Sequence, residues 1–400
     1  MDRINIEQYY NEIKEELTGN ILPFWDKTID KEKGGFYGKI LNDGKIIKDA
    51  PRSAVLNTRI LWTYSAVYRQ LKEEKYLKLA KWAYKYIHQH LKDEENGGIF
   101  WLVDARGNPI ETKKQIYAQA FCIYALSEYY LITKDEDASN WAAEIFDLIE
   151  ENSFDSEYPG YFEAYDKEWS LLEDVRLSEK DKNEMKTMNT HLHVLEGYTN
   201  LMRIWENKKL RLQLKQLIEI FLDKIIDPET GHFNLFFDDY WNLRSDEFSY
   251  GHDIEGSWLL YEAGQVLGNE ELLERIESAS LRLAEVTLME GVDDDGGLMN
   301  EGIISGVIDT DKHWWSQAEA MVGFVNAYQI TKEKKFYEAS YNCWEFIKEN
   351  IVDKENGEWF FRVDKEGQPY YSEENKVGPW KAPYHTTRTC LELMRRLKSL

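Results

Sequence analysis

The sequence predicts an all-α fold, an (α/α)6 barrel of twelve helices in six helical hairpins with short loops or β-hairpins at one rim. Three observations predict it. A glycine turn motif recurs six times, helical apolar spacing fills the intervals between the copies, and the prolines fall in or beside the proposed connections. A ring of six hairpins buries every apolar face when it closes, with one layer of helices inside and one outside.

In each copy of the turn motif, a glycine lies near an acidic residue and is followed by an aromatic or apolar residue. The copies are EKGGFYG at Gly35, ENGGIFW at Gly98, EYPGYFE at Gly160, ETGHFNLFF at Gly231, DDGGLMN at Gly297 and ENGEWFF at Gly357. The glycines are separated by 63, 62, 71, 66 and 60 residues. One copy would be an ordinary turn, but six copies at this spacing indicate a structural repeat.

The segments between the turns have the apolar spacing of helices, as residues 73–91 (EEKYLKLAKWAYKYIHQHL) and 118–134 (AQAFCIYALSEYYLITK) illustrate. Each interval has room for two helices, so six repeats give twelve. An open solenoid is the alternative, but six units fit a closed ring and no capping repeat is evident. We therefore expect residues 1–400 to form one barrel domain.

Composition narrows the possible partners. A formal net charge of −24 and a pI near 4.9 oppose binding to nucleic acid or to an anionic membrane, so a small-molecule substrate fits better. The N-terminus has no signal pattern and no apolar run approaches the roughly 18 residues of a membrane span. We expect a cytoplasmic protein that is a monomer or weak homodimer. Its three isolated cysteines, Cys122, Cys343 and Cys390, are expected to be buried reduced thiols.

The second helix of each repeat begins with a concentration of polar and aromatic residues. The six openings read LNTRILW, QIYAQAF, MNTHLHVLE, SYGHDIEGSW, KHWWSQAE and KAPYHTTR. If these helices form the inner ring, their openings meet at one mouth of the barrel, where binding sites are commonly found. The candidate pocket residues are Arg59, Tyr117, His193, His252, Trp315 and His385.

The stretch MNTHLHVLE places His191 and His193 two residues apart. On a helix these side chains point about 200° from each other, so both cannot face the pocket. Asn189 and His193 are four residues apart and share a face. We expect His193 to face the pocket and His191 to pack or hydrogen-bond behind it.

Helical spacing also predicts which other side chains share a face with the candidates. The pairs are His252 with Glu255, Trp315 with Glu319, Arg59 with Trp62, and His385 with Arg388. The remaining histidines, His88, His90, His232 and His313, are interpreted as surface or structural.

Three chemistries could use such a pocket. A metal site is disfavoured, because a helix separates the two histidines of His-x-His and no second Glu-x-x-His element is present. Glycoside hydrolysis needs two opposed carboxylates, which 73 acidic residues could supply, but it leaves the histidines unexplained. Two histidines on opposite sides of a carbon next to a carbonyl could remove and return a proton, while an arginine stabilises the enediolate. That describes epimerisation without a cofactor.

At these residues the chain resembles the cellobiose 2-epimerases, within the wider N-acylglucosamine 2-epimerase group. The resemblance runs from PFWD near residue 23 to the C-terminal PYHTTR, and NTHLHVLE, SYGHDIE, WW-x-x-AE and W-K-x-PYH carry it. It implies an (α/α)6 barrel that needs no metal or nucleotide. It also implies reversible conversion of the reducing-end glucose of a β-1,4 disaccharide, cellobiose or lactose, into mannose. A side isomerisation of aldose to ketose is expected from the same enediolate.

The resemblance assigns roles residue by residue. His252 and His385 look like the acid/base pair at C2, His193 like the histidine that assists ring opening, and Arg59 like the group that binds the enediolate. The residues expected to contact substrate are Asn189, Tyr117, Glu255, Glu301, Trp315, Trp380 and Trp62. The last of these is included because it shares a helix face with Arg59.

Substrate choice among these relatives depends mainly on the loops that shape an outer subsite. Relatives specific for mannose or N-acylglucosamine share the barrel and the histidines, and a glycoside hydrolase of the (α/α)6 class stays an alternative. The segment GPWKAPYH and the long insert at residues 165–186 are expected to form the wall of an outer subsite. The W-K-x-PYH pattern favours a disaccharide.

Overall fold

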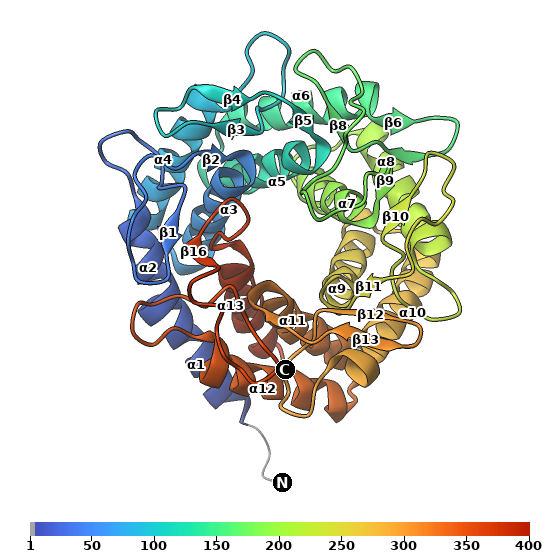
Figure 1. Cartoon of the computed structure of the whole chain (residues 1–400). Helices are drawn as coiled ribbons and strands as arrows, with labels where there is room; N and C mark the ends of the chain where they lie inside the picture. Colours follow the sequence, from blue (N-terminus) through green and yellow to red (C-terminus); the bar gives the residue numbers. More distant parts are fainter. Residues whose placement is uncertain (1–4) are drawn as a thin grey trace.

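The computed structural model describes residues 5–400, in which twelve long helices form two concentric rings (Figure 1). The inner ring comprises α3 (Ala54–Leu71), α5 (Ile116–Thr133), α7 (Met188–Met202), α9 (Tyr250–Leu267), α11 (Trp314–Thr331) and α13 (Tyr384–Leu397). The outer ring comprises α1 (Ile6–Glu15), α4 (Glu74–His90), α6 (Glu136–Asn152), α8 (Lys208–Ile220), α10 (Glu270–Val286) and α12 (Lys334–Phe346). The predicted (α/α)6 barrel is confirmed.

Short helical segments complete the outer layer. Four outer helices continue into one π-helical turn each, and α1 leads through its turn into α2 and a 3-10 turn. These are η1 (Glu16–Ile21), α2 (Leu22–Trp25), η2 (Asp26–Thr28), η3 (Phe221–Ile225), η4 (Thr287–Gly291) and η5 (Ile347–Ile351).

The ring is closed rather than open. Every inner helix packs against the next one, and α13 packs against both α11 and α3, so the last repeat meets the first. The first outer helix, α1, packs against α13. Within residues 5–400 the first long helix is therefore an outer one and the last is an inner one, and the alternative of an open solenoid is wrong.

Burial follows the layer in which a helix lies. In α5 every residue from Ile116 to Tyr129 is buried, because an inner helix is covered by its inner neighbours and by the outer ring. The outer helix α4 buries one stripe only, at Tyr76, Ala80, Ala83, Tyr86 and Ile87. The apolar spacing that predicted the helices thus also decides which face turns inward.

Side-chain caps fix where three inner helices begin. Ser53, Thr187 and Ser249 accept hydrogen bonds from backbone amides three residues later, at the starts of α3, α7 and α9. The cap is worth about 1 kcal/mol per helix. It also sets which residues of the first turn reach the mouth of the barrel.

Short strands line one rim, as predicted, and most of them pair between neighbouring repeats. The inter-repeat pairs are β2 (Arg52–Ser53) with β3 (Leu102–Val103), β5 (Lys114–Gln115) with β8 (Ala164–Tyr165), β9 (Lys186–Thr187) with β10 (Phe236–Phe237), β11 (Phe248–Ser249) with β12 (Glu301–Ile303), β14 (Lys312–His313) with β15 (Arg362–Val363), and β16 (Asn375–Val377) with β1 (Ile40–Leu41). Pairs within a repeat or hairpin add β4 (Pro109–Glu111), β13 (Gly306–Asp309), β6 (Phe154–Asp155) and β7 (Gly160–Tyr161). The β1–β16 pair closes the rim.

A buried ion pair ties the glycine turn to the strand that precedes the inner helix in five of the six repeats. The pairs are Arg52–Asp30 at 2.5 Å, Lys114–Asp93 at 2.7 Å, Lys186–Asp155 at 2.8 Å, Lys312–Asp293 at 2.9 Å and Lys376–Asp353 at 2.6 Å. Each cationic side chain is fully buried. The fourth repeat has Phe248 at the equivalent strand position and is the exception.

The structure also bears on the cysteines and on membrane-spanning helices. All three cysteines are buried and free, as predicted. Within residues 5–400, no helix has both the length and the apolar character needed to cross a membrane.

Candidate active site

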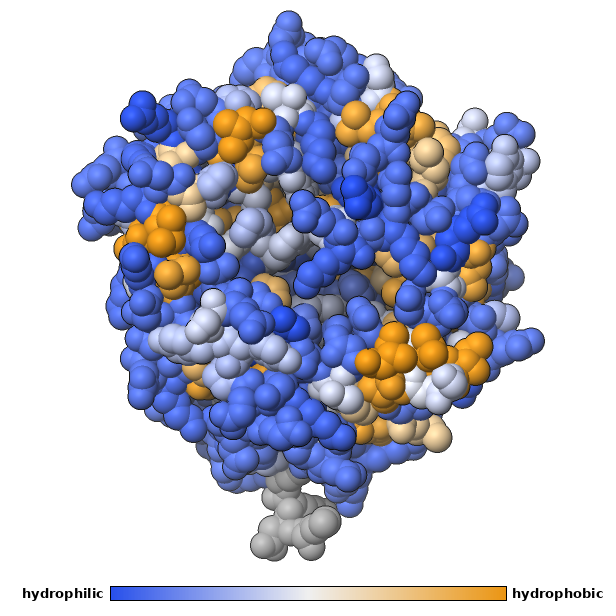
Figure 2. Space-filling view, viewed as in Figure 1, coloured by the Kyte–Doolittle hydropathy of each residue, from blue (hydrophilic) through white to orange (hydrophobic). Residues whose placement is uncertain are grey.

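The N-terminal ends of the inner helices surround a cleft at the strand-lined mouth of the barrel, and Figure 2 shows this face hollowed near the centre of the ring. The cleft has an inner cavity of about 440 Å³ and an outer cavity of about 460 Å³. Asn189, His252, His313 and Trp315 border both cavities. Part of the insert at residues 165–186, from Val175 onward, lines both cavities. The segment GPWKAPYH contributes Trp380 and His385 to the inner cavity and no residue to the outer one.

The structure brings most of the candidate residues together. The inner cavity is lined by Arg59, Tyr117, Asn189, His193, His252, Glu255, Trp315, Trp380 and His385. Glu301 lines the outer cavity, from strand β12. All six inner helices or their preceding strands therefore contribute to one cleft, as the repeat positions predict.

The expectation for Trp62 is wrong. It lines a separate cavity of about 180 Å³ at the opposite end of the barrel, and its ring packs on Tyr124 and Tyr384 at 5.3 and 5.1 Å between centroids. Trp62 lies three residues after Arg59, almost one helical turn deeper from the mouth. Trp62 and Arg59 lie on the same face of the helix, but Trp62 lies too far along the barrel axis to reach the cleft that Arg59 lines.

The two histidines of MNTHLHVLE face different ways. His193 reaches the inner cavity, whereas His191 is fully buried behind it. The Nδ1 of His191 lies 2.6 Å from the Thr187 carbonyl oxygen, and its Nε2 accepts the Tyr161 N–H at 2.9 Å. This arrangement matches the expectation from helical geometry.

The three pocket histidines differ in the group that contacts their Nδ1 atom. His193 Nδ1 lies 3.0 Å from Glu196 Oε2, and His385 Nδ1 lies 2.7 Å from Glu319 Oε1. His252 Nδ1 lies 2.9 Å from the Ser249 hydroxyl, with no carboxylate in that position. Two histidines are therefore supported by a negative charge and one by a neutral hydroxyl.

The histidines that flank Trp315 are both neutral near pH 7. Burial lowers the pKa of His252 to about 3. Burial together with the Arg59 and Arg388 cations holds the pKa of His385 well below its usual value. Their rings lie 4.7 and 5.8 Å from the Trp315 ring, between centroids. With Nδ1 of His385 donating to Glu319, its Nε2 carries the free lone pair.

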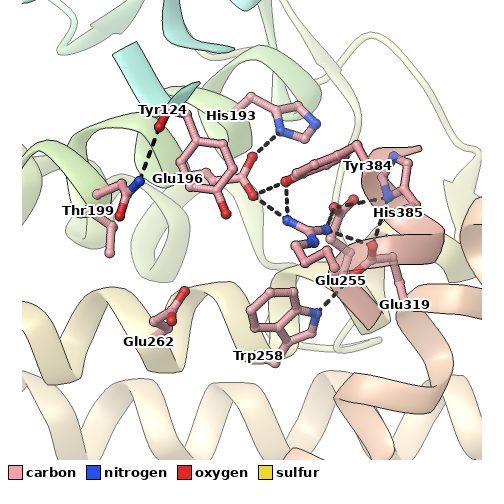
Figure 3. Close-up of polar contacts among 12 residues, drawn as sticks. Tyr124, His193, Glu196, Thr199, Glu255, Trp258, Glu262, Glu319, Tyr384 and His385 are labelled. Atoms are coloured by element: carbon pink, nitrogen blue, oxygen red, sulfur yellow. Dashed lines mark hydrogen bonds and ion pairs between the residues drawn. The ribbon is translucent and has the colours of Figure 1, made fainter. Parts of the chain in front are cut away.

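Arg388 lies beneath the cleft at the centre of a buried network that Figure 3 shows in part. Its guanidinium donates to Glu196, to Glu255 at 2.5 Å and to Glu319 at 2.6 Å, and it also bonds the Tyr384 hydroxyl. One cation thus supports three carboxylates. The network links the carboxylate behind His193 to the carboxylate behind His385.

Two carboxyl groups of the network have pKa values shifted in opposite directions. Burial acts to raise the pKa of Glu196, but Arg388 and His193 outweigh it, and the pKa is lowered. Burial and the adjacent Glu319 raise the pKa of Glu255 to about 8. Glu196 and Glu255 therefore differ in how readily they take up a proton, although both contact Arg388.

Arg59 and Asn189 present unpartnered polar atoms at the cleft. Arg59 donates from Nη1 to the Trp380 carbonyl oxygen and from Nη2 to the Tyr117 hydroxyl, both at 2.8 Å, while its Nε donates to no protein atom. The Oδ1 of Asn189 accepts no hydrogen bond from the protein. Both residues line the inner cavity, and a polar ligand that reached these atoms would supply the missing partner.

Sequence reasoning missed two residues of the site, Glu196 and His313, and it paired a third, Glu319, with Trp315 rather than with His385. Helical spacing was the available signal for Glu196, which follows His193 by three residues, but only the structure shows which histidine each carboxylate contacts. His313 was expected to be surface or structural, yet it borders both cavities. It lies at the N-cap of α11, where strand β14 delivers it to the mouth.

A metal ion does not fit the carboxylates of the site. Among residues 5–400, the one cluster with metal-ligand spacing is Glu255, Glu319 and His385. Arg388 already donates to both carboxylates of that cluster. A cation there would meet the guanidinium charge at close range.

Comparison with known proteins identifies the family of this chain. The family model for N-acylglucosamine 2-epimerase (GlcNAc 2-epimerase) matches residues 35–389. A cellobiose 2-epimerase of Bacteroides fragilis is 46% identical over 385 residues, covering 96% of this chain and 98% of the relative. The structure of a cellobiose 2-epimerase from Bacillus thermoamylovorans aligns with a TM-score of 0.94 and 41% identity over 98% of this chain and all of that one. The chain therefore belongs to the N-acylglucosamine 2-epimerase family.

Proposed function

We propose that this protein is a cellobiose 2-epimerase, which interconverts glucose and mannose at the reducing end of a β-1,4 disaccharide such as cellobiose or lactose. The observation that supports it best is that two neutral histidines, His252 and His385, line one cavity and both pack against the Trp315 ring. A neutral imidazole can take a proton from carbon, and its conjugate acid can return one.

The proposed reaction begins with an opened sugar in the inner cavity. His193, supported by Glu196, assists ring opening, so that C1 becomes a carbonyl. One of the pair His252 and His385 then takes the C2 proton, and the electrons move to the C1 oxygen to give a cis-enediolate. Arg59 stabilises the negative oxygen. The other histidine takes up a proton from water in the cleft and donates it to C2 from the opposite side, which inverts that carbon, and the first histidine then releases the abstracted proton to water.

The remaining cleft residues orient the substrate. Asn189, Tyr117 and Glu255 bind hydroxyls of the reacting sugar, with the unpartnered Asn189 Oδ1 as one acceptor. Trp315 and Trp380 pack against the sugar rings. Reprotonation of the same enediolate at C1 instead of C2 would yield a ketose, so slow aldose-to-ketose isomerisation is part of the proposal.

The outer cavity supports a disaccharide over a monosaccharide. It is about as large as the inner cavity and adjoins it at Asn189, His252 and Trp315, which line both. Its lining includes Ser178, Asp181 and Glu301, which are polar side chains that a second sugar ring could contact. A monosaccharide would leave this space to water.

Proton NMR of cellobiose with EDTA-treated protein in D2O tests the proposal. We expect deuterium at C2 of the reducing-end sugar together with a glucosyl-mannose product, and both should disappear in His252→Asn and His385→Asn variants. His88→Asn is a matched control, because His88 is exposed on an outer helix. Release of free glucose without exchange at C2 would instead identify a glycoside hydrolase.

A further inference from the structure

Four repeats share a contact between the inner helix and the glycine turn. In each of them, the side chain of the fourth residue of the inner helix accepts a hydrogen bond from a backbone N–H that lies just after the glycine of the turn. The contacts are Gln119 to the Ile99 N–H, His191 to the Tyr161 N–H, Asp253 to the Phe233 N–H and Gln317 to the Leu298 N–H, at 2.7 to 2.9 Å. We call these four side chains the tether residues. His191 thus has the structural role that separates it from His193.

Asp253 is the one acid among the tether residues. The other three are neutral as they accept their hydrogen bonds, since Gln119 and Gln317 are amides and His191 accepts through an unprotonated nitrogen. Asp253 is fully buried, and a buried carboxylate needs a cation or further hydrogen bonds. His232 is the partner of this carboxylate, with its Nδ1 at 2.7 Å from Asp253 Oδ2, and it is a cation when protonated.

The fourth repeat also lacks the fixed cation of its neighbours. Where the other repeats place a buried lysine or arginine on the strand, this repeat has Phe248. The His232 ring stacks on Phe248 with 3.7 Å between centroids and an interplanar angle of 3°. The repeat that carries His252 has therefore exchanged a permanent cation for a titratable one.

The groups around His232 favour its protonated form. Besides Asp253, Glu290 of η4 lies 3.3 Å from Nε2, and the Tyr250 ring packs at 5.9 Å. Arg282 of α10 is nearby but donates to the carbonyl oxygens of Glu229 and Thr230. Burial acts to lower the pKa of His232, but the hydrogen bonds and charges of Asp253 and Glu290 outweigh it and raise that pKa.

We propose that His232 and Asp253 form a positioning pair that sets the first turn of α9 and, through it, the proton-transfer geometry of His252. Asp253 is the next residue after His252, and it fixes that turn to the Phe233 amide. His252 has only the Ser249 hydroxyl on its Nδ1, so the backbone supplies most of its orientation. The inference rests on the proposed catalytic role of His252.

The pair makes that geometry depend on pH. Because the pKa of His232 is raised in the folded protein, its favourable contribution is present in full below the unfolded pKa of about 6.5 and is lost as pH rises through the folded pKa. Loss of the proton leaves Asp253 buried with a neutral partner. The first turn of α9 then loosens, and kcat falls on the alkaline side while KM changes little, since the substrate is held mainly by other helices.

Two variants test the pair by kcat, KM and C2 deuterium exchange between pH 6 and 9. His232→Gln removes the cation, and we expect kcat at pH 7 to fall by about tenfold with KM within about twofold, because a misplacement of about 1 Å can cost about 100-fold. Asp253→Asn makes the tether neutral, as in the other repeats. It should fold normally, retain more activity than His232→Gln and lose the alkaline decline that His232 causes. His90→Gln, on an outer helix, is the control.

The outcomes separate this inference from the function on which it rests. If wild-type protein shows no C2 exchange, the proposed function fails and the positioning role fails with it. If wild-type protein epimerises but His232→Gln keeps its kcat and its pH profile, the positioning role alone is overturned. A purely structural role would lower the unfolding temperature of His232→Gln while leaving the pH profile of kcat unchanged, and that result also overturns it.

Discussion

Glu319→Gln isolates the carboxylate that supports His385. Glu319 accepts from His385 Nδ1 at 2.7 Å, from Arg388 at 2.6 Å and from Trp258 Nε1 at 3.0 Å. The glutamine keeps the shape but removes the charge, and its amide group can turn its N–H toward the imidazole. The ring then carries its proton on Nε2, where the free lone pair is needed.

The structure sets the size of the effect. A hydrogen bond to a charged group contributes about 1.5–3 kcal/mol, and each 1.36 kcal/mol of barrier is a factor of about ten in rate. We therefore expect kcat for cellobiose at pH 7 to fall by about 10- to 100-fold. Glu319 is fully buried and borders neither cavity, so KM should stay within about twofold.

The assay follows epimer formation and C2 deuterium exchange together, which should fall in parallel if proton transfer is impaired. Glu128→Gln is the matched control, because Glu128 is also a buried carboxylate bound to an arginine, Arg69 at 2.5 Å, but lies at the other end of the barrel. It should keep wild-type kcat. A Glu319→Gln enzyme within about twofold of wild-type kcat would refute the proposed support of His385.

Three further outcomes are expected. Arg388→Met leaves its carboxylates without a cation, so urea unfolding should show a loss of about 3–5 kcal/mol at pH 7 and a smaller loss at pH 5, where those carboxylates take up protons. Because the pKa values of His252 and His385 lie well below the usual 6.5, kcat/KM should stay flat from pH 7 to pH 5. Trp315→Ala should raise KM about tenfold, whereas Trp62→Phe should leave KM within about twofold.

Each of these has a contrary result. Equal destabilisation of Arg388→Met at both pH values would show that the carboxylates do not take up protons when the guanidinium is removed. A fall of kcat/KM centred near pH 6.5, absent from the substrate itself, would show that one histidine titrates normally. A large KM effect at Trp62 would place substrate deeper in the barrel than the cleft extends.

Local signals in the sequence were enough to predict the architecture. The six glycine turns and the helical spacing between them depend on neighbours a few residues apart, and the structure has the twelve helices in the two layers that they indicate. The same rule of helical facing separated His193 from His191 correctly. Hydroxyl caps such as Ser249 fix where a helix begins, so the residues that form its first turn were also encoded locally.

The sequence by itself therefore determined the closed helical barrel and the set of polar side chains that meet at its mouth. Only the tertiary structure decided which of them touch. Trp62 proved to face the opposite cavity, His313 the cleft, and Arg388 three carboxylates from three other helices. The reason is physical: spacing along one helix sets relative directions, but the rotation and depth of each helix are set by packing against its neighbours in the ring.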